Sequence, residues 1–333
     1  MLGNNEKNSI VEIVEKFYKN KTPKVKVDNI DEQKEFLDFG PITYTEKARA
    51  FLKVQDGCNN FCSYCLIPYA RGRIRSRKSK SVLEEIDLIA KKGIKEVVIN
   101  GIHVASYGKD LNEDYYLIDL LEDINKIDGI SRIRLGSLEP NIITEDFVKR
   151  LAKLSKICNH FHLSLQSGCD ETLKRMNRKY TAKEFKNAVE LLRKNFKDVA
   201  LTADVIVGFP GETEEEFKET YKFLNDLKFT KIHVFKYSPR EGTRAAVMNG
   251  QISSEVKEER SKKLIEISNK YEKEFLEGQI GKKLEVLFEQ KEDEYWKGHT
   301  SNYIVVKTRG EKLENKILRV KITGIDNLEL IGE

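Results

Sequence analysis

Three cysteines crowd into one short stretch of this 333-residue chain, and their spacing is that of a ligand set. Cys58, Cys62 and Cys65 follow the pattern C-x3-C-x2-C within residues 57–65, which we call the cysteine loop. Three thiolates on one loop can bind three irons of a cubane cluster, whereas full cysteinyl ligation of a [4Fe–4S] cluster takes four. The loop therefore predicts a cluster with one open iron, free to bind a substrate or cofactor.

Two plainer interpretations of the same residues stay open: a zinc site and an incidental group of thiols. Zinc would need a fourth ligand, and structural zinc sites usually pair two short motifs. Cys158 and Cys169 are single residues far along the chain, so neither supplies a second motif. We expect these two to be small, semi-buried thiols. The odd count of five cysteines also argues against a disulfide framework.

A repeating strand–helix rhythm after residue 48 would place the cysteine loop at the end of the first strand. Six such units in a row predict a parallel sheet, and right-handed crossovers would curl it toward a barrel or an open doubly wound sheet. The expected strands are residues 50–55, 96–101, 132–137, 160–166, 200–207 and 231–237. Capping boxes are expected at helix starts for the pairs Ser81/Glu84, Thr181/Glu184 and Thr213/Glu216.

The pattern divides the chain into three parts. Residues 1–47 hold a short helical segment at 10–18 and then a polar stretch that reads as a linker. Residues 48–277 hold the six units and end in a long charged helix at 254–277. Residues 278–333 alternate apolar and polar side chains, which predicts a small antiparallel barrel. Its expected strands are 283–290, 302–308 and 317–323, with turns at glycines 298, 310 and 324 and at 326–327.

Composition and charge indicate which cellular compartment and which class of partner to expect. The chain is 39% hydrophobic and 34% charged, with no long apolar run and no signal-peptide pattern, so we expect a cytoplasmic protein that does not span a membrane. Residues 71–80 hold six basic and no acidic side chains, and residues 174–197 hold nine basic and two acidic ones. Such patches fit a polyanion, although a solvated surface is the plainer alternative. Residues 278–333 are balanced, with ten basic and ten acidic side chains.

The cysteine loop, with Tyr64 as the aromatic residue before its last cysteine, resembles the signature of the radical S-adenosylmethionine (SAM) superfamily. The segment GIHVASYG at 101–108 resembles the enzymes that methylthiolate N6-threonylcarbamoyladenosine (t6A) at tRNA position 37, and residues 278–333 resemble the RNA-binding TRAM barrel. Segments that resemble the methylthiotransferase branch more widely are GCNNFCSYCLIPYARGRIRSR at 57–77, SLEP at 137–140, LSLQSG at 163–168, MNRKYT at 176–181, DVIVGFPGET at 204–213 and FKYSPREGT at 235–243.

The resemblance implies a partial (β/α)6 barrel with a small C-terminal all-β barrel, and a [4Fe–4S] cluster on Cys58, Cys62 and Cys65 that binds and cleaves SAM. The reaction implied is addition of a methylthio group to C2 of t6A. By position, the residues expected around SAM are Tyr64, Gly101, His103, Gln166, Ser167, Asp204 and Gly208. A hydrogen-bonded histidine, a buried acid and a tight turn are the plainer roles of His103, Asp204 and Gly208. The arginines expected to bind RNA are Arg71, Arg73, Arg75 and Arg77.

The resemblance also implies partners: tRNA, a sulfur source, and an electron donor such as flavodoxin or ferredoxin. Family members normally begin with a further domain that carries three more cysteines and a second cluster. Here residues 1–15 resemble only the tail of that domain, so we expect the domain to be missing. Two alternatives therefore stay open, methylthiolation of a ribosomal protein and an inactive RNA-binding remnant.

Overall fold

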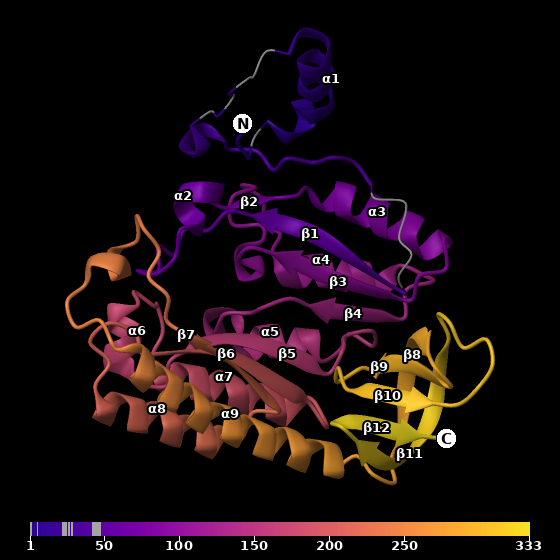
Figure 1. The fold of residues 1–333 in the computed structure, drawn as a ribbon. Coiled ribbons are helices and arrows are strands. Elements are labelled where there is room, and N and C mark those ends of the chain that lie inside the picture. Colours follow the sequence, from indigo (N-terminus) through magenta and orange to yellow (C-terminus); the bar gives the residue numbers. More distant parts are fainter. Residues whose placement is uncertain (1, 5, 22–24, 26, 28, 42–47) are drawn as a thin grey trace.

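Six parallel strands curl into half a barrel at the centre of the molecule (Figure 1). The computed structural model describes residues 2–4, 6–21, 25, 27, 29–41 and 48–333. Parallel bridges from Ile133 to Ile157 and from Leu138 to Leu163 join two sheets into one curved layer. The first sheet has the order β2 (Arg75–Ser76), β1 (Arg49–Asp56), β3 (Glu96–Gly101), β4 (Arg132–Leu135). The second has the order β5 (His160–Gln166), β6 (Ala200–Val207), β7 (Lys231–Lys236).

This layer confirms the prediction of six strand–helix units and selects the curled alternative over the open sheet. All pairings from β1 to β7 along the layer are parallel except that of β2, which runs antiparallel to β1. The strands predicted at 96–101, 160–166 and 200–207 match β3, β5 and β6 end to end. The strand predicted at 132–137 ends two residues early, because the chain bends away after Leu135.

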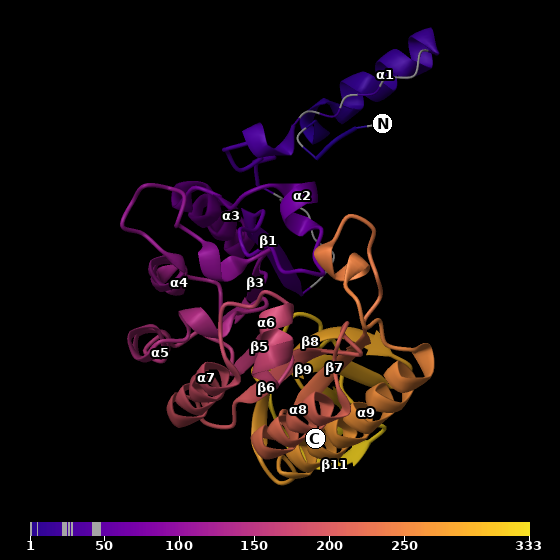
Figure 2. The same ribbon diagram turned by 90° about the vertical axis from the view of Figure 1, so that its left-hand side faces the viewer.

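Helices cover the convex side of the half-barrel, and the open side faces the viewer in Figure 1. In Figure 2, α3, α4, α5 and α7 arc around the outside of the strands. Their apolar faces are fully buried against the sheet at positions such as Ile86, Leu120 and Val189. The helices of this domain are α2 (Ile67–Arg71), α3 (Ser79–Lys91), α4 (Leu117–Lys126), α5 (Glu145–Leu151), α6 (Asp170–Arg175), α7 (Ala182–Asn195), α8 (Glu214–Leu227) and α9 (Ser254–Glu277).

Two of the three predicted capping boxes are confirmed. The hydroxyls of Thr181 and Thr213 accept the backbone N–H of the glutamate three residues later. The side chain of that glutamate accepts the backbone N–H of the threonine. The box predicted at Ser81 is wrong because α3 begins two residues earlier, at Ser79. The Ser81 hydroxyl instead donates to Asp38 Oδ2, at 2.6 Å.

The C-terminal residues form a closed barrel in the strand order β10-β12-β11-β8-β9. Two of its strands, β9 and β12, were not predicted from the sequence. The turn predicted at Gly298 is wrong. Gly298 lies inside β9, where an added Cβ would sit 2.2 Å from the Leu287 carbonyl oxygen, so glycine is needed for the close pairing with β8. Gly324 likewise lies within β11, whereas Gly310 lies in a loop and Asn327 in a turn as predicted. The strands are β8 (Lys283–Glu292), β9 (Tyr295–Thr300), β10 (Val305–Thr308), β11 (Ile317–Asp326) and β12 (Glu329–Gly332).

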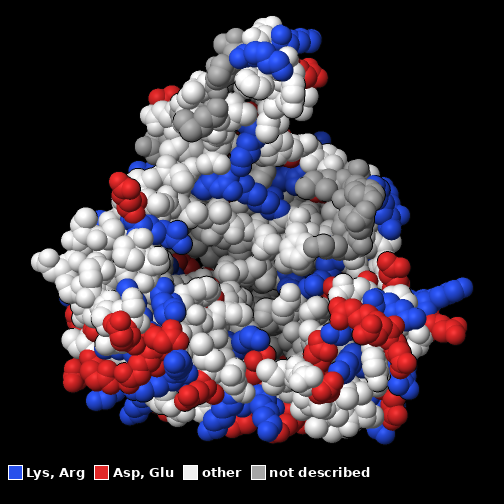
Figure 3. Space-filling view, in the orientation of Figure 1, with Lys and Arg blue, Asp and Glu red and all other residues white. Residues whose placement is uncertain are grey.

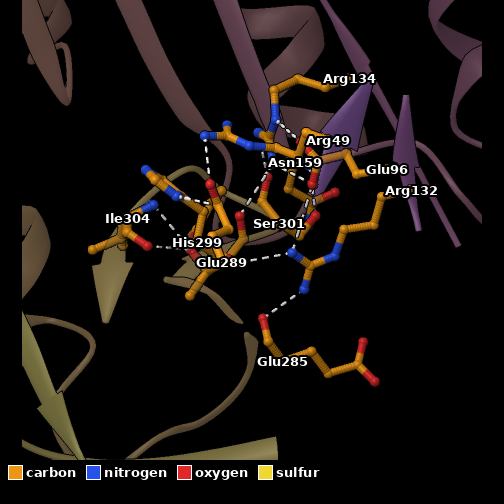
Figure 4. Close-up of polar contacts among 12 residues, drawn as sticks. Arg49, Glu96, Arg132, Arg134, Asn159, Glu285, Glu289, His299, Ser301 and Ile304 are labelled. Carbon is orange, nitrogen blue, oxygen red and sulfur yellow. Dashed lines mark hydrogen bonds and ion pairs between the residues drawn. The ribbon is translucent and has the colours of Figure 1, made fainter. Parts of the chain in front are cut away.

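Arginines from the half-barrel join the two domains (Figure 4). Arg132 donates to the backbone carbonyls of Glu285 and His299, both at 2.7 Å, and Arg134 donates to those of Ser301 and Thr300. Arg134 also forms a buried ion pair with Glu96, at 2.7 Å. These side chains stand at the N-terminal ends of the strands, so the C-terminal barrel closes the end of the half-barrel opposite the cysteine loop.

Helix α1 (Ile10–Asn20) of the N-terminal segment projects away from the half-barrel in both ribbon views, whereas Asn4 and Asp38 of the same segment bond to Arg71 and Arg77. Helix α1 confirms the helical segment predicted at 10–18. The remaining short turns of 3-10 helix are Lys7–Ser9, Ile30–Glu32, Val104–Ser106, Pro140–Ile142 and Arg244–Val247. Nowhere in the described part of the chain is a helix long and apolar enough to cross a membrane.

Candidate active site

The cysteine loop leaves the C-terminal end of β1, the edge where parallel barrels place their chemistry. Gly57 makes the turn with a φ of +71°, and an added Cβ would lie 1.8 Å from the Arg73 carbonyl oxygen. The Cys58 N–H then donates to the Gly72 carbonyl, at 3.1 Å. Only glycine fits this crossing, so residues 57 and 72–73 fix where the loop begins.

Residues 175–178, at the end of α6, hold the other side of the cysteine loop. Ser63 donates its N–H to the Met176 carbonyl at 3.0 Å and its hydroxyl to the Arg175 carbonyl at 2.8 Å. Asn177 donates its amide to the Phe61 carbonyl at 2.8 Å. The motif MNRKYT therefore braces the loop through backbone contacts.

The donor set of the loop fits an iron–sulfur cluster. Cys58, Cys62 and Cys65 are free thiols and partly exposed, whereas Cys158 and Cys169 are buried, more deeply than the semi-buried placement predicted for them. Burial raises the pKa of Cys58 to about 11 and also raises the pKa of Cys65, so loading a metal must displace protons. Within the described ranges, no three His, Cys, Asp or Glu side chains are grouped to hold one metal ion. A cubane offers each thiolate a separate iron, so its three ligands need not converge on one point.

A buried polar network lies against the loop. Arg178 donates to Cys62 Sγ at 3.2 Å and forms an ion pair with Glu139 at 2.6 Å. The opposite oxygen of Glu139 lies 2.9 Å from Nε2 of His103, and Asn60 donates to the carboxylate at 2.8 Å. Burial alone would raise the pKa of Glu139, but the hydrogen bond from His103 and the charge of Arg178 outweigh it and hold the pKa at about 2. The carboxylate is therefore ionised at any working pH.

A cavity of about 500 Å³ opens beside this network, between the loop and the N-terminal ends of α4 and α5. We call it the loop cavity. Its lining combines amide, imidazole and amine groups with an apolar wall. The residues are Asn59, Asn60, Ile74, His103, Ala105, Ser106, Tyr107, Lys109, Tyr116, Leu117, Glu139, Asn141, Ile142, Thr144, Phe147 and Lys179.

Some of the residues predicted to surround SAM do meet at this edge. His103 lines the loop cavity, and its backbone N–H donates to Gln55 Oε1 at 2.7 Å. Gly101 lets Gln55 approach, because an added Cβ would sit 2.9 Å from the same oxygen. Tyr64 lies within the loop and packs edge-on against Phe209, with the ring centroids 6.3 Å apart.

Other predicted residues lie elsewhere or are already engaged. Ser167 is fully buried, bonded to the Thr220 hydroxyl at 3.1 Å and accepting the Cys169 N–H, so its hydroxyl has partners within the protein and its role toward SAM stays a prediction. Gln166 ends β5 with a φ of +68° and, like Asp204 and Gly208, does not line the loop cavity.

Asp204 and Gly208 make contacts that fit their plainer structural roles. The Asp204 carboxylate lies 3.1 Å from Nε2 of His162 on the neighbouring strand. The Gly208 N–H donates to Glu212, which forms a buried ion pair with Arg260 at 2.7 Å. Both therefore have a partner within the protein, and a role toward SAM stays a prediction.

The RNA-binding prediction is wrong for two of the four arginines. Arg75 and Arg77 are 4% and 5% exposed. Arg77 pairs with Asp38 and Glu85, and Arg75 faces Asp56 at 3.6 Å, so both neutralise acids inside the protein. Residues 75–77 are all buried, at the short strand β2 and directly after it, which a charge count cannot reveal. Arg71 is partly exposed, and Arg73 is exposed with its guanidinium 4.6 Å from the ring centroid of Phe61 in the cysteine loop.

Sequence reasoning missed Arg178, Glu139 and Asn60 as site residues. Each lies inside a segment that resembles the methylthiotransferase branch, so the segments carried the signal. These residues meet only through long-range contacts. Asn60 and Glu139 are separated by 79 positions in the sequence, and Arg178 and Cys62 by 116. Nothing in local spacing predicts such a contact.

Comparison with known proteins identifies the superfamily of the chain. The sequence pattern of the radical SAM superfamily matches residues 52–224. A solved structure of the radical SAM methyltransferase TsrM from Kitasatospora setae matches with a TM-score of 0.51 and 20% identity, over 60% of this chain and 38% of that one. The chain belongs to the radical SAM superfamily, and its cofactors are SAM and a [4Fe–4S] cluster.

Curated relatives narrow the class. The threonylcarbamoyladenosine tRNA methylthiotransferase MtaB of Bacillus subtilis is 39% identical over 97% of this chain and 73% of its own length, and that of Aquifex aeolicus is 39% identical over 97% and 77%. The tRNA-2-methylthio-N6-dimethylallyladenosine synthase of Acetivibrio thermocellus is 40% identical over 85% of this chain and 60% of its own length. Within the superfamily, the chain is a member of the tRNA methylthiotransferase family.

Proposed function

We propose that this chain modifies tRNA by adding a methylthio group to C2 of t6A at position 37. The observation that carries the proposal is the cysteine loop itself: three free thiols at the C-terminal edge of a six-stranded half-barrel, beside a cavity of about 500 Å³. We further propose that residues 48–277 form the catalytic domain, that residues 278–333 bind RNA, and that residues 1–47 belong to a further domain and linker of the family.

In this proposal Cys58, Cys62 and Cys65 hold the cluster, whose open iron supplies the binding and reductive cleavage of SAM. The protein's own groups position the parts. Arg178 places a fixed positive charge against the Cys62 sulfur, and Glu139 orients both that guanidinium and the His103 ring. His103 and Gly101 then present one side of the site to SAM.

The choice of t6A over the dimethylallyl nucleoside rests on the relatives and the cavity. The two relatives named for t6A align over 97% of this chain, against 85% to 94% for relatives named for the dimethylallyl nucleoside at similar identity. The loop cavity also carries two lysines, which suit an acidic substituent better than a hydrocarbon one. The relatives reported above are named for tRNA nucleosides, which favours tRNA over a ribosomal protein as the substrate.

The test is an anaerobic assay of the chain after cluster reconstitution, with SAM, a reductant and one of three tRNAs that differ only at position 37. We expect the tRNA that carries t6A to stimulate 5′-deoxyadenosine formation more than the tRNAs with dimethylallyladenosine or adenosine. Equal stimulation by all three would remove the nucleoside assignment. No 5′-deoxyadenosine with any of them would favour the inactive RNA-binding remnant.

We expect Arg73 to contact tRNA phosphate, because it is the exposed arginine of its segment and flanks the cysteine loop. Figure 3 shows a band of Lys and Arg between the N-terminal segment and the half-barrel, while the C-terminal barrel carries both signs. Arg73→Glu should weaken tRNA binding and lower the slope of log affinity against log salt by about 1 to 2. Lys273→Glu, on the exposed side of α9, is the matched control, and an unchanged slope in both variants would contradict the assignment.

A further inference from the structure

The loop cavity carries positive charge that its own lining does not balance. Two lysines, Lys109 and Lys179, line it, and Glu139 is the one acid among its lining residues. That carboxylate is already met by Arg178 and His103, so its charge is not available to the lysines. Lys179 donates to the neutral Asn177 amide oxygen, at 2.7 Å. The cavity therefore has an excess of cations over anions.

The start of helix α4 also borders the cavity. Tyr116 and Leu117, at the start of the ten-residue helix α4, line the cavity. The N-terminus of a helix carries partial positive charge that favours anions within the first turn. Asn141 lines the same side and donates to the Lys179 carbonyl at 3.4 Å, which holds that segment in place. Asp119 in the first turn of α4 accepts the Tyr116 N–H at 2.7 Å, so a carboxylate already meets this helix end. The two lysines are therefore the groups that favour an anionic ligand.

Part of the remaining lining is apolar, and this part suits a flat, uncharged body. Ile74, Ala105, Ile142 and Phe147 contribute this wall. A hydrocarbon arm would leave two lysines without a counter-charge, and a polyphosphate would have few apolar partners here. The lining matches a ligand with an aromatic body and one short carboxylate arm.

We propose that the loop cavity binds the acidic arm of the substrate nucleoside, and that Lys109 and Lys179 determine specificity by pairing with its carboxylate. This inference rests on the proposed function, since t6A carries such an arm on a purine. Lysine–carboxylate contacts are charge-assisted hydrogen bonds, which are stronger than neutral ones. The same lysines would gain nothing from a dimethylallyl group.

The test measures dissociation constants of the full chain, reconstituted with its cluster, for three anticodon stem–loops that differ only at position 37. These carry t6A, dimethylallyladenosine or adenosine. The variant is Lys109→Ala combined with Lys179→Ala; both lysines are exposed, so the fold should persist and thermal melting checks it. Lys153→Ala, an exposed lysine outside the cavity, is the control.

We expect the double variant to lose about 10- to 100-fold in affinity for the t6A stem–loop and to bind the other two within about twofold of the wild type. An equal loss for all three would mean that the lysines contact phosphate, and would overturn the inference. So would an unchanged affinity for t6A, or a raised KM for SAM in RNA-free cleavage, because SAM also carries a carboxylate. Failure of the proposed function itself would look different: the wild type would not prefer t6A and would form no 5′-deoxyadenosine.

Discussion

Replacing Cys58, Cys62 and Cys65 together with alanine should abolish reductive SAM cleavage, by more than about 1000-fold, which corresponds to ~4 kcal/mol of lost transition-state stabilisation. The three thiols are the free, partly exposed cysteines that follow β1, whereas the other two cysteines are buried. Without them the cluster has no protein ligands, so the visible absorbance of the reconstituted protein should vanish as well. Anaerobic reconstitution followed by quantification of 5′-deoxyadenosine measures both effects.

The matched control is the variant with alanine at both Cys158 and Cys169, which are 2% exposed and lie outside the loop. It should keep the cluster absorbance and most of the cleavage activity, with a modest loss of stability from the smaller side chains. If the triple variant kept its iron, or the control lost it, the assignment of the ligands would be wrong.

Arg134→Ala should destabilise the protein by about 3–5 kcal/mol, because it leaves a buried carboxylate without its partner. Glu96 is 0% exposed, and Arg134 lies 2.7 Å from it while also donating to two carbonyls of the C-terminal barrel. Arg132, at 3.8 Å, is too far to replace the lost hydrogen bonds. Urea unfolding followed by the fluorescence of Trp296, the single tryptophan, reports the loss in the C-terminal barrel.

Two comparisons sharpen that test. Lys149→Ala removes an exposed ion pair on α5 and should change stability by less than about 1 kcal/mol. Combining Arg134→Met with Glu96→Gln should recover part of the loss, because no uncompensated carboxylate remains. If Arg134→Ala cost no more than Lys149→Ala, the arginine network in Figure 4 would not hold the two domains together.

The fold was largely predictable because its signals are local. Capping boxes at Thr181 and Thr213 and buried apolar runs in β5 and β6 each follow from a few neighbouring residues. The C-terminal barrel was harder, because β9 contains Gly298, which pairs with β8 only through a contact that the sequence does not display. Strand β12 was also hard to predict, because it is only four residues long.

The candidate site was predictable in its ligands and less so in its surroundings. The three cysteine ligands all lie within the nine residues of the cysteine loop, so the sequence displays them directly. The Arg178–Glu139–His103 network instead joins three separate strand–helix units. Among the arginines of residues 71–77, the sequence predicted two site residues that the structure places inside the protein. The count of arginines indicated a binding patch, whereas Arg75 and Arg77 neutralise buried acids, because their partners Asp56 and Glu85 lie elsewhere in the sequence and meet them only in the fold.

The most direct test of the central claim is electron paramagnetic resonance of the reconstituted, reduced chain with and without SAM. We predict about four irons bound through the cysteine loop, a [4Fe–4S] signal, and a change in that signal when SAM is added, because one iron has no cysteine ligand. A signal that SAM leaves unchanged, or tight binding of one zinc in place of iron, would contradict the account.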